Sequence, residues 1–152
     1  MTAYSRLFPV HVSVITVIER MRGYSLATSR GEATLAGVTS KTAEIYMTSL
    51  RSTEVLPLTL EVAPVAAQLM ALFPNTPTPP RRSHRLAESR QDRLSRWRFD
   101  IMIAATALVQ DMPLIHNNPQ DLEPMRALIE TVPERFPGVG PLNLISVKRL
   151  AA

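Results

Sequence analysis

The sequence predicts an α/β fold in which helices flank a mostly parallel β-sheet. Short apolar segments rich in β-branched residues lie near both ends of the chain and have the composition of buried strands. Longer segments with apolar residues at helical spacing lie between them, and strands that alternate with helices favour a parallel sheet. A chain of 152 residues has the size of one domain, so we expect a single domain over residues 1–152.

The first expected element is a buried strand that turns directly into a helix. Residues 10–15 (VHVSVI) are short and rich in Val and Ile, which predicts a strand. Residues 17–27 then have helical character. Thr16 and Glu19 have the spacing of a capping box, in which two side chains satisfy free backbone amides at a helix start. The pattern therefore places a strand-to-helix junction at residues 15–17.

A helical region, a short extended piece and an amphipathic helix come next. Residues 31–53 are weakly periodic and read as helix. Residues 55–60 contain Pro57 and favour an extended piece at a sheet edge, where a missing N–H donor is tolerated. Apolar residues at helical spacing predict a helix over residues 61–73, and Pro64 is accommodated because it falls in the first turn.

A segment rich in Pro and Arg, residues 74–98, follows that helix. Its first part, residues 74–80 (PNTPTPP), cannot continue a helix and is expected to be an extended linker. Residues 83–99 predict a helix with arginines over most of its surface. Residues 100–109 are apolar on nearly every side and predict a second helix, buried in the core and opened by Asp100.

The last third of the chain predicts a strand–helix–strand unit. Residues 113–116 form a short expected strand, residues 117–120 a polar loop and residues 121–130 a helix. After a turn rich in Pro and Gly, residues 142–147 (LNLISV) form the last expected strand.

Positive charge is concentrated in one stretch of the chain. The whole chain carries a net charge of +4, but residues 81–98 hold seven Arg against two acids, a net +5, so the remainder sums to −1. The planar arginine fork suits phosphate, which points to a partner such as an RNA backbone, with Trp97 available to stack on a base. The alternative to RNA binding is that the arginines only form a solvated helix face. The alternative to base stacking is that Trp97 is a core residue. The arginines expected to contact RNA are Arg81, Arg82, Arg85, Arg93, Arg96 and Arg98.

The composition excludes several classes of protein. The chain has no Cys, which excludes disulfides, thiolate zinc sites and cysteine nucleophiles. No apolar run approaches the ~20 residues that span a bilayer. The first residues lack the basic and apolar parts of a secretory signal. We therefore expect a cytoplasmic protein without a membrane partner. A small-molecule-binding α/β domain ranks last, because no G-x-G-x-x-G motif follows a strand.

Polar side chains suited to a metal follow the expected strands. Glu19 comes after the first strand, Asn118 and Asp121 come after the strand at 113–116, and Asp100 opens the buried helix. Ligands collect at the carboxyl ends of parallel strands. Three carboxylates in one pocket are unfavourable unless they are protonated or bridged by a cation, and oxygen ligands select Mg²⁺ or Mn²⁺. Helix capping is the alternative role for each of these residues.

Two segments of the chain resemble PIN-domain ribonucleases, particularly the VapC-type toxins of bacterial toxin–antitoxin operons. The first is SVITVIERMRG (residues 13–23), and the second is FDIMIAATALVQDMPLIHNNPQDLEPM (residues 99–125). The positions that match the family pattern are Ser13, Ile15, Thr16, Glu19 and Gly23 in the first segment, and Asp100, Ile103, Ala104, Ala105, Ala107, Leu114, Asn118 and Asp121 in the second. Leu122 replaces the aromatic residue of the family.

The resemblance implies a PIN-like fold, which is a Rossmann-like, mostly parallel sheet flanked by helices, and an acidic pocket that binds Mg²⁺ or Mn²⁺ and cuts RNA. By position, Glu19 is the second family acid and Asp100 the third. Asn118 stands at the fourth position, with Asp121 as a further carboxylate. The family also implies a cognate antitoxin as partner, and pairing of the chain with itself is left open.

One departure from the family bears on activity. The first family acid lies in an amino-terminal strand, whereas here no Asp or Glu precedes Glu19. Either the true start lies upstream and this chain is a truncated form, or the protein has lost a metal ligand and a central strand. The two hypotheses are therefore a divalent-metal endoribonuclease with Glu19, Asp100 and Asp121 as catalytic acids, and a non-catalytic remnant that binds RNA or an antitoxin.

Overall fold

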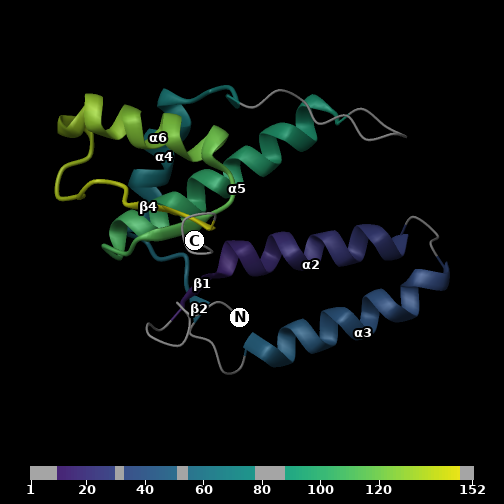
Figure 1. Ribbon diagram of the computed structural model, residues 1–152. Coiled ribbons are helices and arrows are strands. Elements are labelled where there is room, and N and C mark those ends of the chain that lie inside the picture. The colour runs from purple at the N-terminus through teal and green to yellow at the C-terminus, as the bar shows by residue number, and fades with distance from the viewer. Residues whose placement is uncertain (1–9, 30–32, 51–54, 78–87, 148–152) are drawn as a thin grey trace. The chain divides into compact units, whose positions relative to one another are not determined.

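A computed structural model describes residues 10–29, 33–50, 55–77 and 88–147. It shows a mixed α/β chain that is mostly helical, with short strands in parallel pairs (Figure 1). The chain divides into two compact units, essentially Ala3–Pro57 and Leu58–Ala152, which are described one at a time. The expectation of a single domain over residues 1–152 stays a prediction.

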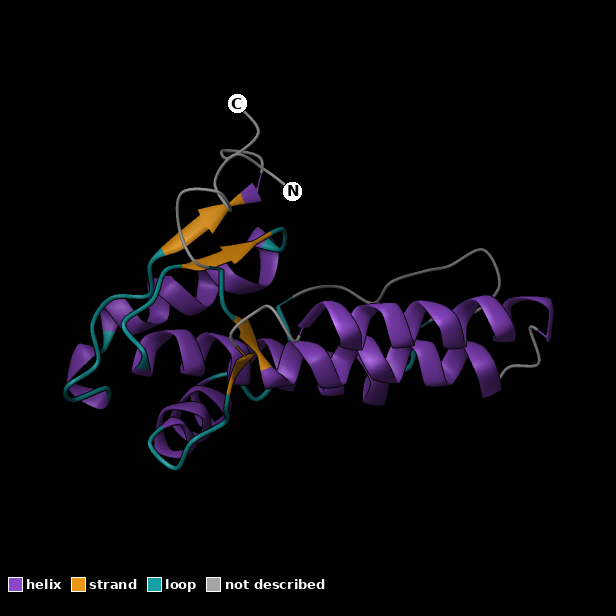
Figure 2. Ribbon diagram, turned by 90° about the horizontal axis from the view of Figure 1, so that it is seen from below, coloured by secondary structure: helices purple, strands orange, loops and turns teal. Residues whose placement is uncertain are grey.

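The first unit is a helical hairpin between two short strands. Its elements are β1 (Val12–Ser13), α2 (Val14–Ser29), α3 (Ala33–Ser49) and β2 (Val55–Leu56). The helices α2 and α3 lie side by side and antiparallel in both views (Figures 1 and 2). The guanidinium of Arg20 lies 5.9 Å from the ring centres of both Tyr24 and Tyr46, which joins the two helices. Parallel pairing of β1 with β2 places Val12 opposite Val55.

The junction between β1 and α2 lies earlier than the sequence pattern predicts. The strand expected over residues 10–15 has only two residues, and α2 begins at Val14 instead of Val17. Ser13 is the reason, because its hydroxyl oxygen accepts a hydrogen bond from the backbone amide of Ile15 at 3.2 Å and so caps the helix. The capping box expected from Thr16 and Glu19 is therefore wrong, since both residues lie within α2.

The second unit packs three helices with a parallel strand pair. In chain order its elements are α4 (Val62–Leu72), α5 (Arg90–Val109), β3 (Leu114–His116), α6 (Pro119–Thr131), a 3₁₀ turn (Pro133–Arg135) and β4 (Leu144–Ser146). The strand β3 pairs in parallel with β4, and α6 forms the crossover between them. The one mostly parallel sheet expected from the sequence is thus, among the described residues, two separate two-stranded parallel sheets.

The two helices expected over residues 83–99 and 100–109 are one continuous helix in the described part of the chain. Its start is fixed by Ser89, whose hydroxyl oxygen accepts from the Asp92 amide at 3.1 Å and donates to the Asp92 carboxylate at 2.7 Å. No Gly or Pro interrupts the sequence from there to Val109. The expectation that Asp100 opens a helix is therefore wrong, because Asp100 lies in the middle of α5.

Other boundaries shift by a few residues. The helix α6 begins at Pro119 instead of residue 121, because proline is favoured in the first helical turn, where its missing amide has no partner to lose. The strand β4 covers three of the six residues expected, and α4 agrees closely with the expected helix. Of the extended piece expected over residues 55–60, only Val55–Leu56, which form β2, are a strand. In the expected linker, residues 74–77 have no helix or strand, and residues 78–80 lie outside the described residues.

The apolar core of the second unit forms where α4, α5 and α6 meet. Along α5 the buried side chains recur at helical spacing, as in Trp97, Ile101, Ala104 and Leu108. Small alanines on that face let α4 approach closely. The buried positions from α4 and α6 are Val62, Val65, Ala66 and Leu69, and Leu122, Met125 and Ile129. None of the described helices has both the length and the apolarity needed to cross a membrane.

Candidate functional site

Asp100, Asn118 and Asp121 lie together in the second unit, and we call them the acid–amide cluster. The side-chain nitrogen Nδ2 of Asn118 donates to Oδ2 of Asp121 at 2.6 Å and to Oδ2 of Asp100 at 3.4 Å. The three residues are 18 and 3 positions apart in sequence, so the fold brings Asp100 to the other two. The structure thus joins three of the four site residues expected from the sequence.

The strand β3 and the start of α6 place two members of the cluster. Asn118 lies in the N-cap position of α6, two residues after β3 ends, and Asp121 lies in the first helical turn. Negative charge is favourable there because the first backbone amides of the helix have no partners within it. Asp100 enters from the middle of α5, which packs against α6. The cluster therefore lies at the carboxyl end of a parallel strand, where α/β proteins bind ligands.

Asp121 is the buried member of the cluster. Its residue is only 1% exposed, and its Oδ1 atom is buried without a hydrogen-bond partner. A buried carboxylate oxygen is unfavourable unless a donor or a cation satisfies it. Asp100 and Asn118 are half-buried by comparison. The Asp121 Oδ1 atom is therefore the atom of this cluster that could accept a further donor or a cation.

His116 supports the cluster from the end of β3. Its ring is buried at 7% exposure, and its Nδ1 atom accepts a hydrogen bond from the Asn118 backbone amide at 3.2 Å. Burial lowers the pKa of His116, and this effect outweighs the nearby negative charge of Glu123, which raises it. Neutral His116 thus helps to hold the backbone of Asn118. His116 has no metal-ligand spacing in the sequence, which favours a structural role of this kind, but the sequence does not indicate its contact with Asn118.

The donor set of the cluster suits Mg²⁺ or Mn²⁺. The two carboxylates supply hard oxygen atoms, and one of those atoms, Asp121 Oδ1, lacks a partner, whereas the Asn118 amide faces the acids with its nitrogen. Within the described residues no three His, Cys, Asp or Glu side chains come together as a group that could hold a metal ion. Glu19, expected as a further acid, belongs to α2 in the first unit and is half-buried there. Its participation in the cluster stays a prediction.

The arginines expected to bind RNA have different surroundings. Arg81, Arg82 and Arg85 lie outside the described residues. Arg96 is held by Glu88, with Nε and Nη2 donating to the two carboxylate oxygens at 3.2 and 3.1 Å, and both side chains are 14% exposed. Arg93 is half-buried, whereas Arg98 is exposed. Among Arg93, Arg96 and Arg98, Arg98 is therefore the one most available to a phosphate.

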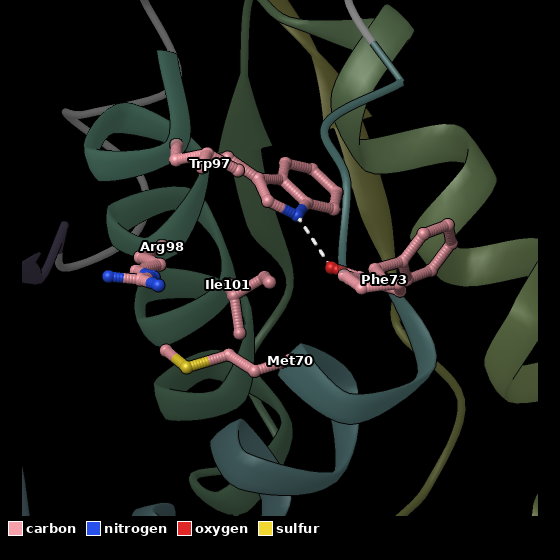
Figure 3. A pocket seen from close by; sticks show the side chains of 7 residues that line it. Met70, Phe73, Trp97, Arg98 and Ile101 are labelled. Carbon is pink, nitrogen blue, oxygen red and sulfur yellow. Dashed lines mark hydrogen bonds between the residues drawn. The ribbon is translucent and has the colours of Figure 1, made fainter. Parts of the chain in front are cut away.

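A pocket of about 440 Å³ lies between α4 and α5 (Figure 3). Its lining includes Trp97, which is 2% exposed and donates its indole N–H to the backbone oxygen of Phe73 at 3.2 Å. The Phe73 ring meets Trp97 edge to face at 5.5 Å. Trp97 is thus a core residue, and the stacking role considered for it is wrong. Arg98 also lines the pocket, but no member of the acid–amide cluster does.

Comparison with known proteins leaves the chain without an assigned family. A scan against protein-family models and a search of curated proteins found no match. The functional argument therefore depends on the residues of the site.

Proposed function

We propose that this protein is a divalent-metal-dependent endoribonuclease of the PIN type, resembling the VapC toxins, which hydrolyses RNA phosphodiester bonds. The observation that carries the proposal is the acid–amide cluster, in which a carboxylate oxygen of the buried Asp121 has no partner. Asp100, Asn118 and Asp121 are also positions at which the chain matches the family pattern.

The residues of the cluster would have distinct roles. Asp100 and Asp121 would hold Mg²⁺ or Mn²⁺ through their carboxylate oxygens, with Asn118 beside them. When bound, such a cation lowers the pKa of a water molecule and neutralises charge on the phosphate. Asp121 is buried at the start of α6, and this burial fixes the position of its carboxylate before a cation binds. The catalytic role that the family resemblance implies for Glu19 stays a prediction.

RNA would contact the basic part of the chain. Arg98 is exposed on α5, and its guanidinium can contact a phosphate of the RNA backbone, although Arg98 and Asp100 are two residues apart and so lie on different sides of the helix. Arg93 and the arginines at 81, 82 and 85 are proposed as further contacts. Arg96 is engaged by Glu88 and is proposed to order the start of α5 instead. A cognate antitoxin is the proposed protein partner, and cytoplasm the proposed location.

An RNA cleavage assay on the full chain tests the proposal. We expect a fluorescent single-stranded RNA to be cut with Mn²⁺ or Mg²⁺ and to be left intact with EDTA. Asp100→Asn keeps the shape of the side chain but removes its charge, and should lower the cleavage rate by roughly 100-fold or more, since cation-based charge stabilisation contributes several kcal/mol. The matched control is Asp111→Asn, an exposed carboxylate outside the cluster, which should cut like the wild type.

Two outcomes would count against the enzyme. Unchanged cleavage by Asp100→Asn, with thermal unfolding showing that the variant is folded, would reject the cluster as the active site. RNA binding without cleavage under every metal condition would favour the non-catalytic alternative, in which the chain binds RNA or an antitoxin.

A further inference from the structure

The side-chain amide of Asn118 lies between the two carboxylates of the cluster. Its Nδ2 atom contacts one oxygen of Asp121 and one oxygen of Asp100, at 2.6 and 3.4 Å. An amide nitrogen carries two hydrogens, so it can donate one to each acid. The opposite orientation would place the amide oxygen against two carboxylate oxygens, which is repulsive. Electrostatics therefore assigns the nitrogen to this position.

This arrangement lets two carboxylates share a partly buried site in the absence of a cation. Like charges at close range raise the free energy of a site, and the two N–H groups of Asn118 offset part of that repulsion. A divalent cation would bind the same carboxylate oxygens at about 2.0–2.6 Å. The amide nitrogen has no free lone pair with which to ligate a cation. A cation and the Asn118 NH₂ group therefore exclude each other from the space between the acids.

Asp121 provides an independent sign that the site is built for more than this amide. Asn118 satisfies only its Oδ2 atom, and the Oδ1 atom of the same buried carboxylate has no partner. Burying an oxygen without a partner is unfavourable, so a structural hydrogen bond alone does not account for this carboxylate. A ligand that contacts both oxygens of Asp121, or that bridges Asp121 and Asp100, would satisfy it.

We propose that Asn118 is a latch, whose NH₂ group holds Asp100 and Asp121 together until a divalent cation displaces it. On cation binding the Asn118 side chain changes rotamer, so that its amide leaves the space between the acids. The inference rests on the proposed function for the identity of the cation. It makes Asn118 a positioning residue that sets how readily the site accepts metal, in contrast to a simple ligand. Cation affinity is then lower than the two acids alone would give.

Calorimetric titration of the 152-residue chain with Mn²⁺ tests the latch. Asn118→Ala removes the competing donor, and water can fill the vacated ligand position. We expect this variant to bind Mn²⁺ roughly tenfold more tightly than the wild type, the ratio that corresponds to the loss of one charge-assisted hydrogen bond. Asn117→Ala, the same change at the exposed neighbouring residue, should bind like the wild type.

Thermal unfolding provides a second readout that does not depend on activity. In EDTA, Asn118→Ala should unfold at a lower temperature than the wild type, because the buried Asp121 carboxylate then loses the donor that contacts its Oδ2 atom at 2.6 Å. Saturating Mn²⁺ should raise the unfolding temperature more in this variant than in the wild type. If Asn118→Ala does not fold, Asn118→Ser replaces it, since one hydroxyl hydrogen cannot bridge both acids. We expect the Mn²⁺ affinity of Asn118→Ser to lie between that of the wild type and that of a site without the competing donor.

The outcomes separate the latch from the proposed function. Wild-type binding of Mn²⁺ with equal or weaker binding by Asn118→Ala would overturn the latch and leave the metal site in place, with Asn118 as a ligand. Absence of Mn²⁺ binding in the wild type and in both Asn118 variants would overturn the latch and the metal-dependent function together. Binding by the variants but not by the wild type would support the latch and contradict a metal-dependent wild-type enzyme.

Discussion

A carboxylate buried as deeply as Asp121 is stable only if its neighbours compensate for the lost water. Asn118 provides one such contact, and Asp121 lies in the first turn of α6, where negative charge is favourable. The proximity of Asp100, Asn118 and Asp121 is what the family resemblance implies, but their burial could not be deduced from the sequence. It depends on how α5 and α6 pack, which is a property of the core. The metal-binding function of the three residues stays a prediction.

At the same scale, His116 predicts a pH dependence of stability. Burial lowers its pKa in the folded state below the ordinary value of 6.5, while nearby Glu123 opposes and Arg126 reinforces the shift. Well above pH 6.5 the ring is neutral in both states, so the folded state keeps its full stability. As the pH falls below that value, the unfolded chain takes up the proton first, and stability decreases until the folded ring also protonates.

The measurement is the free energy of unfolding by urea at about pH 8 and about pH 5.5, a range that brackets the ordinary pKa of histidine. The wild type should lose more stability between these values than His116→Gln, which cannot titrate at this position. The difference between the two proteins isolates His116 from the other groups that titrate. An equal loss in both would show that His116 does not contribute to the pH dependence.

At the scale of elements, helices are easier to predict than their boundaries and their partners. The apolar periodicity of α4 and of the buried half of α5 is local, so it could be read from the sequence. The start of α2 could not, because Ser13 and Thr16 are both good capping residues and only the structure shows that Ser13 caps. The two-residue length of β1 is set by its pairing with β2, some 40 positions away, which no local pattern contains.

The start of α5 gives a prediction for a single element. Ser89 and Asp92 hydrogen-bond to each other at the first turn, so Ser89→Ala removes the cap and should lower the free energy of unfolding by about 1 kcal/mol. Ser95→Ala is the matched control, since Ser95 lies inside the same helix, where alanine is the better helix former. Urea unfolding of both variants checks this. A loss for Ser95→Ala as large as that for Ser89→Ala would contradict the capping role.

At the scale of the molecule, the apolar core is distributed unevenly between the two units. Of the sixteen buried apolar residues in the described part of the chain, fifteen lie in the second unit, and Ile15 is the exception. Burial of apolar surface is the main force that stabilises a fold. The second unit therefore has an apolar core of its own, whereas Ile15 is the one buried apolar residue among the residues of the first unit whose burial the structure describes.

This distribution predicts that residues 58–152 fold on their own. Trp97 is the single tryptophan of the chain, and it is 2% exposed in the second unit. Its indole N–H donates a hydrogen bond to the backbone oxygen of Phe73, so its fluorescence reports on that core. We expect the fragment to show the blue-shifted emission of a buried indole and a urea midpoint, followed at Trp97, close to that of the full chain. Helix content measured by circular dichroism should fall by the contribution of α2 and α3. Emission typical of a solvated indole in the fragment would show that the core forms only in the presence of the first unit.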